Sequence, residues 1–430
     1  MSATVQVLDA SLTLVHQEIP HIPTVTIDVW LRGGTVMETT AERGVAHFVE
    51  HMVFKGTARV KPGEFDRLVE SLGSVTSAAT SYDYTRYSLT TPREHFKTVL
   101  PYLGEMLLGA QIPETELEAE RQVVLAELAQ AWSNPDWISY QFLLATIFDN
   151  HPYGSPVIGS ETEVNQLQRE HLCYFHHKFY QNSPIVVVVV GSLPLDQVLE
   201  PVQSAFHRPI ADTPPCPQYP VPPLPGIIRE ELYLPHLPQD RLLLAWLGPR
   251  ATELQGTIGM ELLSHILGEG RHSRLPLTLK PWGNHVSSGY IAQEWGGFFT
   301  ISTYLEQEQR QAVESTILQV TRDLAAHPIT AEELKRAQRA LHHNFAFLME
   351  SPPELAHFLG YHALLGSYDL CHHWDTLYPE LVWQTTAPDL LHLAQTYLLS
   401  HRYVSLHITT SPPQFAESGV NGLECSDVKP

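Results

Sequence analysis

The sequence is poor in charged residues, and basic residues are the scarcest of these. Only 17% of the 430 residues are charged, whereas 43% are hydrophobic; an average soluble protein has about a quarter of its residues charged. A disordered chain or a coiled coil needs a far more polar composition, so both classes are excluded. Lys and Arg number 26 against 47 Asp and Glu, which gives a net charge of -21. This shortage of cations argues against a nucleic-acid partner, which would be bound mainly through its phosphates.

The sequence also lacks paired cysteines and long apolar runs. Its four cysteines stand far apart without a C-x-x-C pair, so neither a disulfide framework nor a zinc ribbon is expected. The most apolar run, Ile185–Val190, is six residues long, which suits a buried strand and is too short for a membrane span. No basic segment followed by an apolar core opens the sequence. We therefore expect a cytoplasmic protein without a signal peptide or a membrane partner, with the lumen of an organelle as the alternative.

A proline-rich stretch divides the sequence almost in half. Its prolines exclude helix and central strand, and favour an extended connector. We predict two domains of similar topology, each an α+β fold with a mixed or antiparallel sheet packed against helices. The predicted limits are 1–210 for the first domain, 211–227 for the linker, 228–412 for the second domain and 413–430 for a mobile tail.

Each half contains a strand, a short loop and a helix that ends at a glycine turn. The first copy reads VWLRGGTVMETTAERGVAHFVEHMVFKGT and the second LLAWLGPRATELQGTIGMELLSHILGEG. The copies differ most where the first has HFVEH and the second has SHILG. This difference predicts one functional site per chain. Other predicted strands, rich in β-branched and aromatic residues, lie at 80–92, 185–191, 285–305 and 403–408.

His47 and His51 are the first candidate metal ligands. Residues at i and i+4 of a helix lie on one face, so both imidazoles can reach one ion. Glu50 projects close to the same face and can reach a water bound to that ion. This H-x-x-E-H order is the inverted form of the zincin spacing. A chain with 24 histidines can also contain such a spacing by chance.

The helix predicted over 114–132 supplies candidates for a third ligand. Glu120 and Glu127 are two helical turns apart and therefore share a face, beside the apolar stripe of Leu117, Val124 and Leu128. Carboxylates next to a buried face are costly unless they are paired or bind a metal. The alternative is that both carboxylates are simply solvated.

At these residues the sequence resembles a known family. GVAHFVEHMVFKGT is similar to the zinc helix of the pitrilysin-type inverzincin peptidases, in particular the short single-subunit forms such as the β-subunit of mitochondrial processing peptidase and its bacterial relatives. The similarity continues through LGSVTSAATSYDYTRYSLTTP, ERQVVLAEL, HPYGSPVIGSETEV and REHLCYFHHKFYQNSPIVVVVVG. These segments cover most of residues 25–192, and the second half matches more loosely.

The resemblance implies a site and an activity. His47, His51 and Glu127 match the family's ligands for one Zn2+ per chain, Glu50 matches the base that activates the zinc-bound water, and Glu120 matches a supporting carboxylate behind the site. The implied function is a zinc-dependent metalloendopeptidase that hydrolyses short or unfolded peptides inside a clam-like dimer. The alternative is a non-proteolytic structural core subunit of a larger complex. Such subunits typically lose a ligand or the base, whereas all four residues match here.

The resemblance also implies a substrate strand. In this family an extended peptide pairs with a sheet edge near the zinc. Ser77, Ala78, Ala79 and Thr80 match that edge, and their small side chains would let a substrate backbone approach. Ser77 stands where the family usually has an Asn that bonds the substrate. The alternative for this segment is an ordinary half-buried strand.

A substrate clamp of the family has no match in the second half. Relatives with the full machinery have an Arg and, seven residues later, a Tyr. Lys280 and Val286 stand there instead, in a segment that is one residue shorter. Lys cannot form the bidentate fork of Arg, and Val has no hydroxyl. Tyr290 could serve only after a register shift. We therefore expect a heterodimer with a related zinc-less subunit that carries the Arg/Tyr pair, and a homodimer as the second choice.

Overall fold

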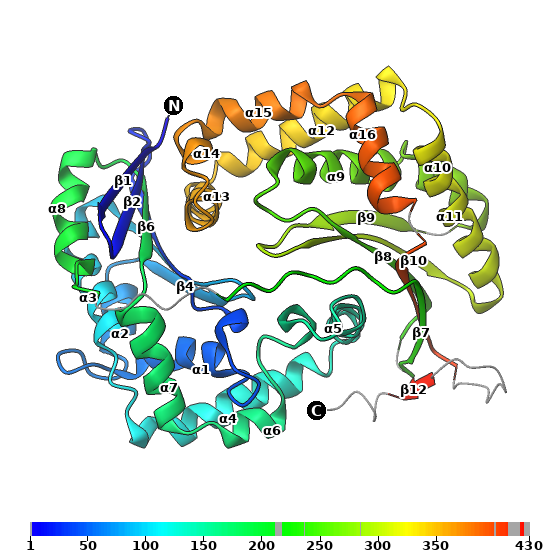
Figure 1. Ribbon diagram of the computed structural model, residues 1–430. Helices are drawn as coiled ribbons and strands as arrows, with labels where there is room; N and C mark the ends of the chain where they lie inside the picture. The colour runs from blue at the N-terminus through cyan, green and yellow to red at the C-terminus, as the bar shows by residue number, and fades with distance from the viewer. Residues whose placement is uncertain are drawn as a thin grey trace. The chain divides into compact units, whose positions relative to one another are not determined.

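The computed structural model describes residues 2–210, 217–235, 237–283, 285–399, 401–411 and 422–424. It contains two six-stranded sheets, each packed against helices (Figure 1). The α+β class with two similar sheet-and-helix domains is thereby confirmed. Contacts divide the chain into two compact units. Unit 1 comprises Met1–Gln130, Pro156–Pro217 and Ala346–Tyr378, and unit 2 comprises Ala131–Ser155, Gln218–Phe345 and Pro379–Pro430.

The sheet of unit 1 is mixed and has the strand order β1-β2-β6-β3-β5-β4. Strands β2 and β6 are parallel, and every other neighbouring pair is antiparallel. The strands are β1 (Thr4–Asp9), β2 (Leu12–Glu18), β3 (Thr24–Leu31), β4 (Val75–Thr80), β5 (Thr85–Pro92) and β6 (Ile185–Gly191). The main helices are α1 (Val45–Met52), α2 (Glu64–Ser71), α3 (Phe96–Gly109), α4 (Glu114–Ala131), α6 (Glu161–Gln166), α7 (Arg169–His176), α8 (Leu195–Phe206), α13 (Pro352–Leu364) and α14 (Tyr368–His372).

Strand β6 forms the centre of this unit. Its sequence IVVVVVG is buried at every position, as expected of a strand whose two faces are both covered. Successive side chains of a strand point to opposite faces, and Val186, Val188 and Val190 pack with helix α13. The continuous apolar run that predicted a buried strand therefore lies in the middle of the sheet.

The sheet of unit 2 has the strand order β12-β7-β11-β8-β10-β9. Strand β7 pairs in parallel with β11 and β12, and the other pairs are antiparallel. The strands are β7 (Ile227–Tyr233), β8 (Asp240–Gly248), β9 (Val286–Ile291), β10 (Gly297–Leu305), β11 (Tyr403–Thr409) and β12 (Gly422–Glu424). The helices are α5 (Pro135–Ile147), α9 (Leu254–Leu267), α10 (Arg274–Leu279), α11 (Arg310–Ala326), α12 (Ala331–Met349), α15 (Trp374–Gln384) and α16 (Ala387–Leu393), of which α12 and α15 run past the limits of the unit.

The two units interleave along the chain. Helix α13, from the second half of the sequence, packs on β3 and β6 of unit 1, whereas α5, from the first half, packs on β8 and β11 of unit 2. Of the predicted linker, 211–216 lie outside the described residues. Of the predicted tail, only Gly422–Glu424 are described, and they pair with β7. The domain limits taken from the sequence remain a prediction.

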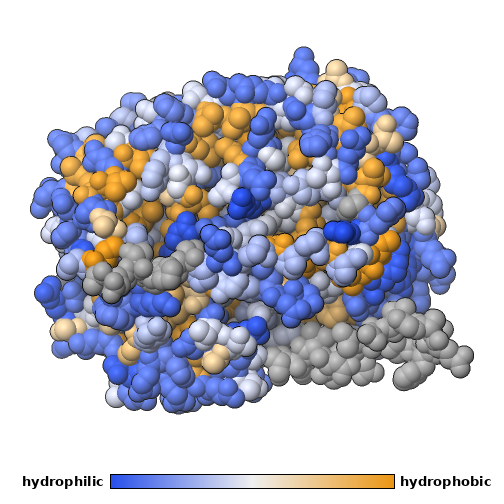
Figure 2. Space-filling view, in the orientation of Figure 1, coloured by the Kyte–Doolittle hydropathy of each residue, from blue (hydrophilic) through white to orange (hydrophobic). Residues whose placement is uncertain are grey.

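Most of the apolar residues are buried in the cores of the two units. On the face that Figure 2 shows, hydrophobic residues occur in separate groups among hydrophilic ones. Within the described part of the chain, no helix is both long enough and apolar enough to cross a membrane.

The docking of α13 depends on one glycine. A Cβ placed on Gly360 would lie 2.0 Å from Nε1 of Trp30, a fully buried side chain on β3. Ala in a helix is ordinarily preferred to Gly by about 1 kcal/mol. Here the methyl group has no space, because the indole is held on its other sides by the core.

We predict that Gly360→Ala lowers the free energy of unfolding by about 1–3 kcal/mol, the usual cost of overpacking a core. Chemical denaturation followed by tryptophan fluorescence measures this. Gly226→Ala is the matched control, because a Cβ there meets no atom within 4 Å. Equal stability of the two variants would contradict the packing described here.

Candidate metal centre

Helix α1 presents the predicted ligands because its other face is buried. It begins after Gly44, whose φ of 84° is a left-handed conformation that favours glycine. The carboxylate of Glu38 accepts hydrogen bonds from the backbone N–H groups of Gly44 (3.1 Å) and Ala46 (2.8 Å), two donors that a helix start leaves unpaired. The buried residues of α1 are Val45, Ala46, Phe48, Val49 and Met52. His47, Glu50 and His51 are left on the opposite side.

The structure brings three of the predicted residues together. One ligand atom each from His47, His51 and Glu127 lies within 4.8 Å of the others, the one such group found among the described residues. Oε1 of Glu127 is 3.8 Å from Nε2 of His47, and Oε2 is 3.4 Å from Nε2 of His51. When two ligand atoms bind a tetrahedral zinc ion, each at the usual distance of about 2.1 Å, the two atoms are about 3.4 Å apart. The spacing of these atoms therefore fits a metal ion.

Glu120 holds the ring of His51 from behind. Oε1 of Glu120 lies 2.9 Å from Nδ1 of His51, so the ring donates from Nδ1 and directs Nε2 toward Glu127. Such a carboxylate fixes the tautomer and orientation of a metal-binding histidine. Nδ1 of His47, in contrast, is buried and has no hydrogen-bond partner among the described residues.

The surroundings of His47, His51 and Glu127 shift the pKa of each of these side chains. Burial by itself would lower the pKa of His51, but hydrogen bonds to Glu120 and Glu127 raise it to about 9. Burial and the neighbouring His51 lower the pKa of His47 to about 4. The hydrogen bond from His51 holds the pKa of Glu127 below its ordinary value. Without a metal, the site therefore contains one imidazolium, one neutral imidazole and one carboxylate.

Glu50 lies on the same helix face and is held by the neighbouring strand. The hydroxyl of Thr80, at the end of β4, donates a hydrogen bond of 2.5 Å to Oε2 of Glu50. Burial raises the pKa of Glu50 above its ordinary range, and the bond from Thr80 opposes this only in part. A carboxyl group with a raised pKa is suited to accept and return a proton near neutral pH. No sequence pattern predicts this contact, because it joins side chains from two different elements.

Strand β4 lies at the edge of its sheet. Among the described strands it pairs only with β5, and helix α1 packs against it. Ser77 and Ala79 are exposed, whereas Ala78 and Thr80 are half-buried. The strand and its edge position agree with the expected substrate strand, and substrate binding there stays a prediction.

The clamp positions in unit 2 offer no Arg/Tyr pair. Lys280 is exposed, and Val286 is 5% exposed at the start of β9. Tyr290 donates its hydroxyl to the carbonyl oxygen of Pro249. Each side chain therefore occupies a structural position or faces solvent.

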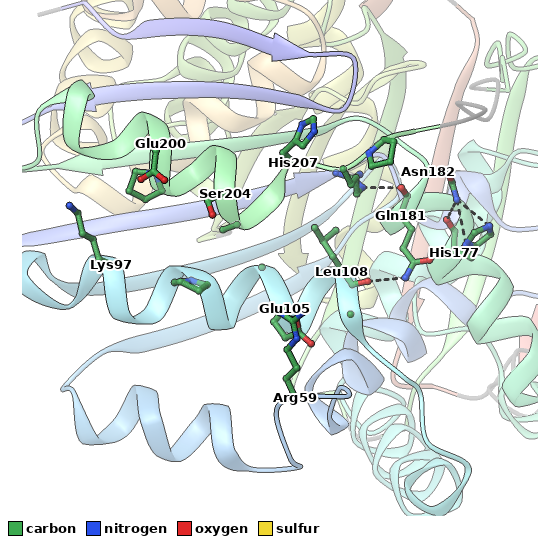
Figure 3. A pocket seen from close by; sticks show the side chains of 17 residues that line it. Arg59, Lys97, Glu105, Leu108, His177, Gln181, Asn182, Glu200, Ser204 and His207 are labelled. Carbon is green, nitrogen blue, oxygen red and sulfur yellow. Dashed lines mark hydrogen bonds and ion pairs between the residues drawn. The ribbon is translucent and has the colours of Figure 1, made fainter.

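A separate hollow in unit 1 contains none of the predicted site residues. It has a volume of about 820 Å³ and is lined largely by helices α3 and α8 (Figure 3). Its polar groups are partly paired: Glu105 accepts a hydrogen bond of 2.8 Å from Thr57, and Gln181 donates to the carbonyl oxygen of Leu108 at 2.8 Å. The hollow therefore does not belong to the metal centre.

The fold and this group of side chains define the class of the protein: a two-unit α+β chain whose first unit brings two histidines and a glutamate together as a candidate metal centre. Residues 13–161 match the family model described as insulinase (peptidase family M16), and residues 166–341 match the peptidase M16 inactive domain. The chain belongs to peptidase family M16, in the short pitrilysin-like form that the sequence predicts.

Known relatives agree with this assignment. An uncharacterized zinc protease of Rickettsia bellii is 24% identical over 368 residues, which cover 84% of this chain and 87% of the relative. The β-subunit of the mitochondrial-processing peptidase of Neurospora crassa is 27% identical over 201 residues, 47% of this chain and 42% of the relative. The crystal structure of a protease from Helicobacter pylori superimposes with a TM-score of 0.86 at 22% identity, covering 95% of this chain and 100% of that chain.

We predict that zinc binding at pH 7 releases about one proton per ion, because Nε2 of His51 must lose its proton to bind the metal. The pKa of His51 is about 9 in the metal-free protein, so the release persists through neutral pH and disappears as the pH rises above 9. Isothermal titration calorimetry in buffers of different ionisation enthalpy measures the proton count. Glu50→Gln is the control and should release the same number. Zinc binding without proton release at pH 7 would show that His51 is neutral beforehand.

Proposed function

We propose that this chain is a zinc-dependent endopeptidase that hydrolyses short or unfolded peptides. The observation that carries the proposal is the convergence of His47, His51 and Glu127, with Glu50 on the same helix face. A zinc ion held by these three ligands would polarise the scissile carbonyl and lower the pKa of a coordinated water.

The remaining steps fall to side chains of this chain. Glu50 would accept the proton of the attacking water and return it to the leaving amine. Thr80 would orient the carboxylate of Glu50, and Glu120 would keep Nε2 of His51 directed at the metal. The free edge of β4 would bind the substrate backbone as an added strand.

The proposed assembly is a heterodimer with a related zinc-less subunit. Its support comes from the three candidate clamp positions that the structure describes: Lys280 is exposed, Val286 is buried, and the hydroxyl of Tyr290 is bonded to the carbonyl oxygen of Pro249. A partner that carries Arg and Tyr would supply the groups that hold substrate and stabilise its oxyanion.

The Glu50→Gln variant tests the activity. The exchange preserves the shape of the side chain but removes the base. We expect bound zinc to stay at one ion per chain while peptide cleavage falls by about 10²- to 10⁴-fold, the usual contribution of a general base. Metal analysis and a peptide mixture read by mass spectrometry measure both quantities. A wild-type protein that binds no zinc would refute the proposal. A protein that binds zinc but cleaves no peptide, either alone or with a candidate partner chain, would favour the alternative of a structural core subunit.

The partner is tested by purification from the native source under gentle conditions. We expect a complex of two different chains, of which the second lacks the H-x-x-E-H residues, and higher peptidase activity for the pair than for this chain alone. Light scattering coupled to size exclusion gives the stoichiometry. A homodimer that is fully active alone would contradict the heterodimer.

A further inference from the structure

A lysine lies directly behind the metal centre. Lys55 is in the short 3-10 turn Val53–Lys55 that follows α1, and its Nζ is 2.5 Å from Oε2 of Glu120. The other oxygen of Glu120, Oε1, accepts a hydrogen bond of 2.9 Å from Nδ1 of His51. Glu120 therefore bridges the two cationic side chains with one oxygen for each.

Lys55 follows the two histidines along the chain. His47 and His51 are four residues apart on α1 and therefore share a face, and Lys55 comes four residues later, in the tighter 3-10 turn. The helical turn continues just far enough to carry Lys55, and then stops at Gly56, whose φ is 112°. From this position the ammonium group reaches the same carboxylate that contacts His51.

Because Glu120 is buried, its ionised form depends on this ion pair. The side chain of Glu120 is 9% exposed and that of Lys55 is 31% exposed. A buried carboxylate without partners is strongly destabilised in its ionised form. Burial alone would raise the pKa of Glu120, but the hydrogen bonds from His51 and Lys55 bring it below its ordinary value.

A bound metal would increase the dependence of Glu120 on Lys55. His51 must then be neutral at Nε2, and its Nδ1–H is an uncharged donor. Among the described residues, Lys55 is then the cation left in direct contact with Glu120. It also occupies Oε2, so only Oε1 is directed at the ring.

We infer that Lys55 is a positioning residue of the metal centre, which fixes Glu120 so that Oε1 accepts the Nδ1–H of His51 and leaves Nε2 free for the metal. The inference rests on the zinc site of the proposed function, and it does not depend on cleavage of peptides. It predicts an effect of Lys55 on zinc affinity that passes through Glu120.

The test compares zinc affinities measured by competition with a chelator of known affinity. Lys55→Met keeps the length of the side chain without its charge, and we expect the affinity to fall by about 10- to 100-fold, as for other residues that orient a metal ligand. Lys55→Arg retains a cation and should bind zinc within a few-fold of the wild type. Lys61→Met is the matched control, because Lys61 is exposed and nearby, and should bind as the wild type does.

A second pair of variants separates positioning from a general loss of structure. In a Glu120→Gln background, Lys55→Met should cause little further loss of zinc affinity, because its route to His51 has already been removed. The metal-free Lys55→Met protein should retain the far-ultraviolet circular dichroism of the wild type.

Three outcomes would overturn the inference. They are wild-type affinity in Lys55→Met, an undiminished effect of Lys55→Met in the Glu120→Gln background, and a loss in Lys55→Arg as large as in Lys55→Met. If wild type binds zinc and Lys55→Met binds equally well, only this inference fails. If the wild type binds no zinc, the proposed function fails as well.

Discussion

The packing of helix α1 against the core of unit 1 is the interaction on which the metal centre depends. Burial of Val45, Phe48, Val49 and Met52 fixes the rotation of the helix about its axis, and the opposite face then carries the two histidines and the glutamate. Helix α4 is fixed in the same way by Leu117, Val124 and Leu128. The packing of the two helices therefore determines how close the carboxylate of Glu127 comes to the imidazoles of His47 and His51.

The charges of the centre are the second constraint. Two histidines and three glutamates lie close together, and such groups are stable together only if opposite charges alternate. His51 is paired with both Glu120 and Glu127, and Lys55 completes the neutralisation of Glu120. Exchange of the His51 proton for a divalent cation adds positive charge beside Glu50 and Glu127.

How much of this the sequence reveals depends on the kind of information required. Helical periodicity places His47 beside His51, and the resemblance extends the set to Glu127. Periodicity cannot predict which side chains of different elements meet, so the contact between Thr80 and Glu50 appears only in the structure. Likewise, an amphipathic helix shows that it buries a face but not against which sheet, so the interleaving of α5 and α13 is not predictable. Strands β1 and β2 have no counterpart among the predicted elements, because their polar residues interrupt the apolar pattern.

The corresponding helix of unit 2 differs from α1 in how much of its surface is buried. Helix α9 occupies the place in the second repeat that α1 has in the first, but ten of its fourteen residues are buried, from Thr257 to Leu267. A helix buried on nearly all sides has no free polar face on which two imidazoles and a carboxylate could meet an ion and solvent. Nδ1 of its one histidine, His265, lies 3.1 Å from Oε2 of Glu269, which follows the end of the helix. Helix α9 therefore has no counterpart of the α1 face that carries His47, Glu50 and His51. The family resemblance places the clamp positions of this unit at Lys280 and Val286 instead. Those positions present one exposed ammonium and one buried aliphatic side chain, and neither reproduces the bidentate fork of an Arg or the hydroxyl of a Tyr.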